Sequence, residues 1–327
     1  MDSDMHPMTS DKDRTPSRRW LVILLRFVVT AALLAIVIYR GSQADLIALI
    51  GWHLVPSVVL GLGLVAVVLF LNAVRWAFIA RAIGSPLPMG TAVELTLIGH
   101  FFSQLLPTSV GGDVFRVWGA RQAGLKLHAA VSSVLFERLA GLVMLVVLMI
   151  VGMPILSARI DSALPLMVAI VLIVGLAVGL LALGNLRRFP AVFRRAKFWA
   201  ALVGLSQSAN ALLKRPRVLG GAFAFSLAVQ IGSLALMWFI ARELGAKLTL
   251  IDALTIVPAV TFLSSLPVSI GGWGVREAGL AGGFALLGLP IEAAIGTSIL
   301  VGLLNLLGAV PGFLLVLCRD EKFSFSP

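Results

Sequence analysis

Two arginines, Arg116 and Arg276, each follow a copy of one short motif and carry the chemistry needed to bind an anion. The copies read Leu-Pro-Thr-Ser-Val-Gly-Gly over residues 106–112 and Leu-Pro-Val-Ser-Ile-Gly-Gly over residues 266–272. Proline and paired glycines interrupt a helix, so each motif predicts a break followed by a half-helix whose free N–H groups carry roughly +0.5 charge. A guanidinium adds a full charge and a planar fork that fits phosphate or carboxylate. The paired motifs therefore favour an anion between them.

Residues at the two breaks are further candidates for the site, because non-helical backbone at membrane depth must line protein or a wet cavity. These candidates are Ser109, Gly111, Gly112, Ser269, Gly271 and Gly272. A glycine is needed where backbones approach closely or where φ is positive. We therefore expect Gly112 and Gly272 to tolerate no β-branched residue.

Acidic residues near the arginines differ between the two copies. Asp113 and the pair Glu137-Arg138 belong to the first copy alone, and Glu277 belongs to the second. This asymmetry fits a substrate with distinct ends, or a proton-coupling carboxylate in one half. The alternative is that Asp113 or Glu137 simply pairs with Arg116 or Arg138. The arginines themselves have a structural alternative, which is to reach the membrane interface or to bond carbonyls of the broken segments.

A second matching stretch shows that the motifs belong to an internal duplication. Residues 124–131 read Gly-Leu-Lys-Leu-His-Ala-Ala-Val, and residues 288–295 read Gly-Leu-Pro-Ile-Glu-Ala-Ala-Ile. The two motifs lie 160 residues apart and these two stretches lie 164 apart. The second copy thus carries four extra residues between its motif and its matching stretch.

Composition excludes a soluble protein. Of 327 residues, 59% are hydrophobic and 13% are charged, and the mean hydropathy of +1.03 leaves too few polar residues for a soluble surface. The single cysteine, Cys318, excludes an internal disulfide, and the four histidines form no ligand pair at helical spacing. No phosphate-binding loop or nucleophile-elbow motif is present. We expect neither a metal nor a cofactor.

Apolar runs predict the elements that position the arginines. Six runs are long enough for a span of about 20 residues, and they cover residues 20–39, 54–75, 131–155, 164–184, 218–240 and 291–318. Two shorter runs, 91–106 and 250–266, end at the two motifs. A signal peptide has a shorter apolar region, so the first run is predicted to be an uncleaved helix.

Positive charges orient the predicted spans. Residues 185–217 hold eight Lys and Arg and no acidic residue, so the positive-inside rule places them in the cytoplasm. The same rule places Arg75 and Arg81 there. In all, 18 of the 26 Lys and Arg are predicted inside and four outside, and four lie within membrane segments.

This assignment requires each short run to be a re-entrant hairpin that returns to the side it entered from. The fold class is then an all-α integral membrane protein, polytopic, with an inverted repeat of about six full spans plus two re-entrant helical hairpins. Inverted repeats with broken helices are a recurrent transporter plan, with the site where the repeats meet. The alternative is that the breaks are ordinary kinks between helices.

The predicted organisation follows the chain in six parts. They are a cytoplasmic N-terminal tail (1–19), the first membrane repeat (20–160), a fifth helical segment opening the second repeat (161–184), a basic cytoplasmic loop (185–217), the remainder of the second repeat (218–318) and a cytoplasmic C-terminal tail (319–327).

Three segments of the chain resemble the flippase-like membrane domain of lysylphosphatidylglycerol synthases, which also occurs as free-standing proteins of about this length. The segments are residues 105–116, 132–138 and 265–277, and the likeness spans about residues 20–318. The resemblance implies a domain that moves a lipid between leaflets, with hopanoid, glycolipid or polyprenyl-phosphate pathways as settings for free-standing members. The chain departs from the fused form because nothing follows Pro327, so aminoacyl transfer is not implied.

We therefore expect a translocase that moves an amphipathic, phosphate-bearing lipid across the bacterial inner membrane, with both termini in the cytoplasm. The head passes Arg116, Arg276, Asp113, Glu137 and Arg138. The alternatives are a membrane-embedded lipid transferase with Asp113 or Glu137 as base, or an accessory subunit or scaffold of a lipid-modifying enzyme. The expected partners are a membrane lipid and a separately encoded lipid-modifying enzyme, and not nucleic acid. The oligomeric state and the headgroup stay open.

The predicted topology is testable with single cysteines in a Cys318→Ser background. Cysteines placed at Ala200 and Lys322 should react only with reagent on the cytoplasmic side, and one placed at Ile160 only from outside. Labelling of positions 160 and 200 from the same side would contradict the inverted repeat.

Overall fold

The computed structural model describes residues 55–106, 111–185, 215–265 and 272–318, and every regular element in these ranges is an α-helix. The predicted first span at residues 20–39 lies outside the described residues, as do Ser109, Ser269 and Gly271. Nearly all of the basic loop also lies outside them.

Ten helices make up the described part of the chain. In the first copy and its extension they are α3 (Val55–Ala82), α4 (Met89–Leu105), α5 (Gly111–Gln122), α6 (Leu127–Ile160) and α7 (Leu164–Gly184). In the rest of the chain they are α9 (Pro216–Glu243), α10 (Leu250–Ser265), α11 (Val275–Leu286), α12 (Ile291–Gly308) and α13 (Val310–Leu317).

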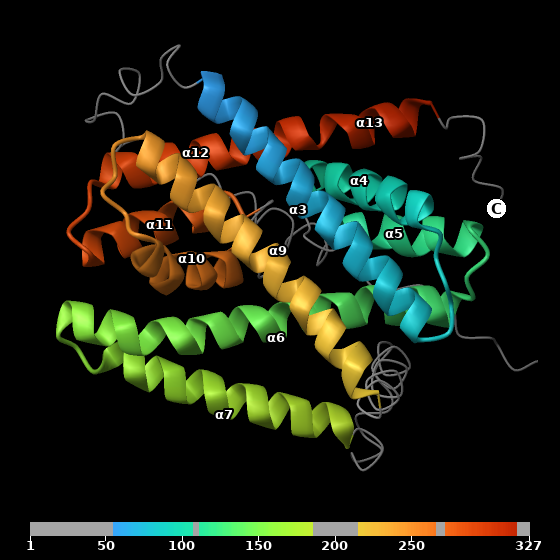
Figure 1. Cartoon of the computed structure of the whole chain (residues 1–327), viewed down its shortest axis with the longest axis horizontal. Helices are drawn as coiled ribbons and strands as arrows, with labels where there is room; N and C mark the ends of the chain where they lie inside the picture. Colours follow the sequence, from blue (N-terminus) through green and yellow to red (C-terminus); the bar gives the residue numbers. More distant parts are fainter. Residues whose placement is uncertain (1–54, 107–110, 186–214, 266–271, 319–327) are drawn as a thin grey trace, which may run out of the picture.

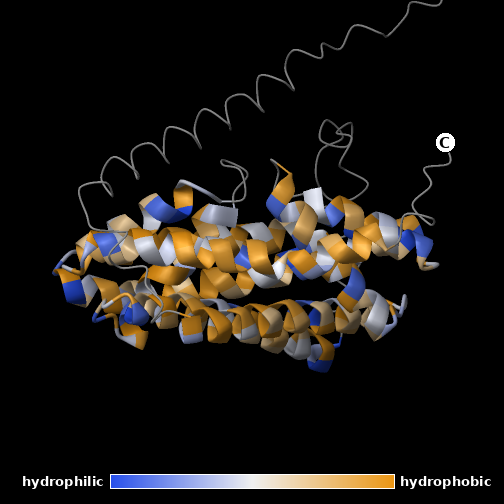
Figure 2. Cartoon of the chain, turned by 90° about the horizontal axis from the view of Figure 1, so that it is seen from above, coloured by the Kyte–Doolittle hydropathy of each residue, from blue (hydrophilic) through white to orange (hydrophobic). Residues whose placement is uncertain are grey.

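Within the described ranges, five stretches are long and apolar enough to cross a bilayer. They are α3, α6, most of α7, α9, and α12 together with α13. Figure 2 shows hydrophobic residues along most of the length of the helices, with hydrophilic patches mainly near their ends. The chain is therefore a polytopic, all-α, multi-pass membrane protein, as the apolar runs predict.

The two short helix pairs form hairpins on either side of a central helix pair. α3 and α9 make the most extensive helix contact in the described bundle, and they run side by side through its middle (Figure 1). α4 packs against α5, and α10 packs against α11. In Figure 1 these two hairpins lie at opposite ends of the bundle. Their placement fits the predicted inverted repeat, whose orientation in the membrane stays a prediction.

Matching helix ends extend the duplication from sequence to structure. Four helices end at a glycine with positive φ, namely Gly84, Gly124, Gly245 and Gly288. After α3 the N–H of Ser85 bonds the carbonyl of Ala80 at 3.0 Å, and after α9 the N–H of Ala246 bonds that of Ala241 at 3.0 Å. This six-to-one bond closes the helix around a left-handed glycine. Both copies therefore turn into their hairpins by the same cap.

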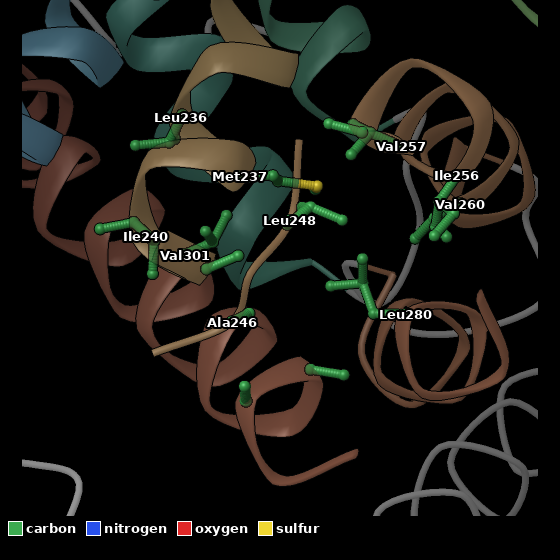
Figure 3. Packing of buried hydrophobic residues seen from close by; sticks show 14 of the residues in the cluster. Leu236, Met237, Ile240, Ala246, Leu248, Ile256, Val257, Val260, Leu280 and Val301 are labelled. Atoms are coloured by element: carbon green, nitrogen blue, oxygen red, sulfur yellow. The ribbon is translucent and has the colours of Figure 1, made fainter. Parts of the chain in front are cut away.

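Each copy also buries its own apolar core at equivalent positions. The first core includes Leu87 and Leu95, and the second includes Leu248 and Ile256, each 161 residues further along. Figure 3 shows the second core, where Leu248 and Ile256 lie among side chains of α9, α10, α11 and α12. Equivalent burial of this kind requires the two copies to fold alike.

Glycines bring the two helices of each hairpin into close contact. A Cβ added at Gly119 would lie 2.2 Å from Leu95, and one added at Gly283 would lie 2.4 Å from Ile256. The contact at Gly112 is closer still, because an added Cβ would lie 2.1 Å from the carbonyl oxygen of Gly99. Backbone therefore packs on backbone where α5 begins.

Several predicted boundaries move in the structure, for example α6 spans Leu127–Ile160 where the apolar run covers 131–155. The span predicted to end at residue 75 continues to Ala82, and the run 291–318 divides at Ala309. Pro311 explains the division, because it has no N–H to continue the hydrogen-bond ladder of α12.

Replacing Gly112 by alanine should lower the Tm in detergent, because the clash is with backbone that cannot rotate away. Gly90→Ala is the matched control, since nothing lies within 4 Å of a Cβ added at this position in the first turn of α4. Alanine should be neutral or stabilising there by about 0.5 to 1 kcal/mol. Equal Tm values for the two variants would show that the α4–α5 contact is loose.

Candidate functional site

A cavity of about 220 Å³ lies where the two copies meet. Its walls come from α3 and α4 of the first copy and from α9, α10, α11 and α12 of the second. Its polar lining residues are Gln104, Ser233, Thr261, Ser264, Arg276 and Asn305. Arg276 is the one charged residue among them. We call this space the central cavity.

Most of the polar lining is held by the helices themselves. Ser233 and Thr261 donate to carbonyls one turn back, at 3.1 and 2.8 Å, and the Asn305 amide does so at 2.8 Å. Such bonds satisfy the donors at membrane depth. Ser264 is different, because its hydroxyl is buried without a hydrogen-bond partner among the described residues. Its hydroxyl is available to a group that enters the cavity.

Arg276 is fixed on one side and open on the other. Its Nε donates to the Ser298 hydroxyl at 2.7 Å, and its Nη2 donates to Glu277 at 3.1 Å. The guanidinium lies 4.9 Å from the ring centroid of Trp273. Its Nη1 donates no hydrogen bond to any described residue. The fork therefore has one nitrogen for a ligand in the central cavity.

Glu277 supports this arginine from behind. It has no exposed surface, and it accepts hydrogen bonds from the Ser298 hydroxyl at 2.6 Å and from the backbone N–H of Gly274. It thereby caps the N-terminus of α11, where a negative charge is stabilising. The carboxylate is absent from the cavity lining, so a ligand there meets the guanidinium and not its counter-charge.

Arg116 has a different environment from Arg276. It is not among the residues that line the central cavity. Its Nη2 is paired with Glu137 of α6, its Nη1 lies 3.6 Å from Asp113, and its guanidinium stacks 4.2 Å from the ring centroid of Trp76. Arg138, with 41% of its side chain exposed, pairs with Asp113 at 2.6 Å. Arg116 therefore ties the first hairpin to α3 and α6.

Arg75 corrects a prediction made from charge alone. It was expected in a cytoplasmic loop, but its side chain is buried within α3, and its Nη2 lies 2.7 Å from both Glu137 and Asn72. Its Nη1 also donates to Ser226 of α9 at 3.4 Å. Glu137 is thus held between two arginines, and Arg75 belongs to this buried cluster.

The second copy lacks this ionic cluster. Leu236 and Val301 occupy the positions that correspond to Arg75 and Glu137 by the offsets of 161 and 164 residues. Both are buried, and both line the central cavity. The first copy thus carries a buried ion pair where the second carries an apolar contact.

The two arginines also differ in helix position. Arg116 is the sixth residue of α5, whereas Arg276 is the second residue of α11. Gly111 and Gly112 lie inside the first turn of α5, whereas Gly272 lies in a turn before α11 with φ 79°. The extra residues of the second copy are therefore accommodated by a later helix start, which brings Arg276 closer to the break.

The sequence-based candidates thus form two groups in the structure. Asp113, Arg116, Glu137 and Arg138 form an ion-pair cluster, whereas Arg276 lines the central cavity with Glu277 paired behind it. The sequence did not indicate Arg75 as a member of the ion-pair cluster. Nor did it indicate four residues that line the central cavity, namely Ser233, Thr261, Ser264 and Asn305. A prediction that the helix continues unbroken to residue 82 would have placed Arg75 inside a span and indicated a buried partner for it. Single hydroxyl residues within apolar runs carry no pattern that would predict a cavity.

Comparison with known families gives one match. The family model described as the lysylphosphatidylglycerol synthase TM region matches residues 23–312. No curated protein matches the chain. The match covers every described helix except the last few residues of α13, so it includes both hairpins and the central cavity.

Glu137→Gln should destabilise the protein, because it leaves two buried guanidinium groups without their shared counter-charge. Breaking a buried ion pair from one side costs about 3 to 5 kcal/mol. Arg138→Gln is the matched control, since its partly exposed pair with Asp113 is expected to contribute at most about 1 kcal/mol. Thermal unfolding in detergent compares the two variants. Equal losses of Tm would show that Glu137 does not hold the first hairpin to α3 and α6.

Proposed function

The chain belongs to the lysylphosphatidylglycerol synthase TM region family, and from this premise we propose that it is a lipid translocase of the flippase-like kind. Its substrate is an amphipathic lipid with a phosphate-bearing head. The lipid moves between the leaflets of the inner membrane of a bacterium, with both protein termini on the cytoplasmic side.

One observation carries the proposal, namely the open face of Arg276 in the central cavity. A guanidinium nitrogen without an acceptor among the described residues is a strong donor for a phosphate oxygen, because bonds between charged partners are shorter and stronger than neutral ones. Ser264 supplies a second donor in the same lining. The cavity wall comes from both copies, which is where transporters with repeats bind their substrates.

The polar head passes through this cavity while the hydrocarbon chains stay in the bilayer. This division avoids moving a charged head through hydrocarbon, which costs several kcal/mol without polar partners. Glu277 and Ser298 hold the guanidinium in place so that little ordering is needed when a head arrives. Motion of the second hairpin against the α3–α9 pair would then expose the cavity to either side.

A lipid transferase is less well supported by the same geometry. Its expected base is Asp113 or Glu137, but the oxygens of Glu137 are engaged with Arg75 and Arg116. Those of Asp113 face Arg116 and Arg138. Neither carboxylate lies in the lining of the central cavity, where the head of a lipid would be.

Replacing Arg276 should lower lipid movement in reconstituted vesicles. The assay follows fluorescent phosphatidylglycerol between leaflets, with and without an imposed proton gradient. Arg276→Gln should slow movement about thirtyfold, which corresponds to the roughly 2 kcal/mol of a lost charge-assisted hydrogen bond. Arg276→Lys keeps the charge without the fork and should lose less.

Arg242→Gln is the matched control for the loss of one positive charge. Arg242 lies in the last turn of α9, is exposed, and is absent from the cavity lining. It should move lipid at the wild-type rate. Wild-type movement by a folded Arg276→Gln variant would contradict the proposal.

A further inference from the structure

An apolar groove lies on the outer surface beside the central cavity, between α4 and the junction of α12 with α13. It has a volume of about 480 Å³, within the range of roughly 300 to 1,000 Å³ of known ligand pockets. Its lining includes Phe101, Leu105, Leu306, Val310 and Phe313, and Gln104 is its one polar lining residue. We call it the tail groove.

The break between α12 and α13 creates this groove. At one end α13 lies directly on α4, because a Cβ added at Gly312 would lie 2.1 Å from the carbonyl oxygen of Leu97. Next to this contact the rings of Phe101 and Phe313 lie 5.4 Å apart. Toward the C-terminal end of α4, the groove lies between Leu105 and Val310. The tight contact fixes its closed end.

The groove and the central cavity share one lining side chain. Gln104 lines both spaces, and Asn305 of the cavity is followed directly by Leu306 of the groove. On the other side the groove opens outward, because Leu105 is 62% exposed and Val310 is 46% exposed. In a multi-pass membrane protein such apolar residues face lipid. A polar space and an apolar space thus meet at Gln104.

We propose that the tail groove binds one hydrocarbon chain of the lipid whose head occupies the central cavity, with Gln104 beside the linkage between head and chain. The inference rests on the proposed function. It adds that recognition depends on chain length as well as on the headgroup. The apolar lining packs against the methylene groups of the chain and fixes the chain direction relative to Arg276.

The test compares phosphatidylglycerol probes with equal heads and different chains, dioleoyl and dihexanoyl, by native mass spectrometry of the full-length protein. The wild type should prefer the dioleoyl probe by at least about tenfold, since each methylene group buried adds to affinity. Val310→Trp fills the groove and should remove most of this preference. Leu105→Trp fills it from the opposite wall and should do the same if the first variant does not fold.

Leu314→Trp is the matched control, because Leu314 lies one turn along α13, is 53% exposed and does not line the groove. It should keep the wild-type preference. Suppose that folded Val310→Trp or Leu105→Trp keeps the same dioleoyl preference as this control, while Arg276→Gln weakens the binding of both probes. The groove then holds only bulk lipid, so the inference fails while the proposed function stands. If Arg276→Gln weakens neither probe, or the wild type binds neither, the proposed function fails and the inference fails with it.

Discussion

Both hairpin arginines depend on one constraint, which is that a guanidinium buried at membrane depth needs a carboxylate partner. Arg116 pairs with Glu137 on α6, and Arg276 pairs with its own neighbour Glu277. The pairing of Arg116 connects the first hairpin to α6 and α3, because Glu137 also pairs with Arg75 of α3. Among the described residues, the hydrogen bonds of Arg276 go to Glu277 of α11 and Ser298 of α12, so that part of its guanidinium is left for the central cavity. A buried pair contributes more to position than to stability.

Duplication followed by divergence explains how one motif came to have two roles. The cap glycines, the hairpin contacts and the core positions are shared by both copies. The charges are not shared, because Leu236 and Val301 stand where the first copy has Arg75 and Glu137. The first copy has become a fixed support held by five charged residues. The second copy has apolar residues at the positions of Arg75 and Glu137, and its Arg276 lines the central cavity.

Much of the fold could be predicted from the sequence, because apolar runs and helix breakers act locally. All apolar runs within the described residues are helices, and each motif is followed by the expected half-helix. The site was predicted only in part. The equal roles expected for Arg116 and Arg276 followed from equal motifs. In the structure the four extra residues delay the start of α11, so Arg276 lies at the start of its helix whereas Arg116 lies further along α5. Arg75 looked like a loop charge because only tertiary packing shows its pairing with Glu137.

The central claim is that Arg276 gives the central cavity a preference for anions. The most direct measurement uses Ser264→Cys in a Cys318→Ser background, because Ser264 lies in the same lining. Its rate of modification is compared for an anionic and a cationic methanethiosulfonate reagent of similar size. The account predicts modification roughly tenfold faster by the anionic reagent, the change expected for about 1.4 kcal/mol of electrostatic preference. Equal rates, or faster modification by the cationic reagent, would contradict it.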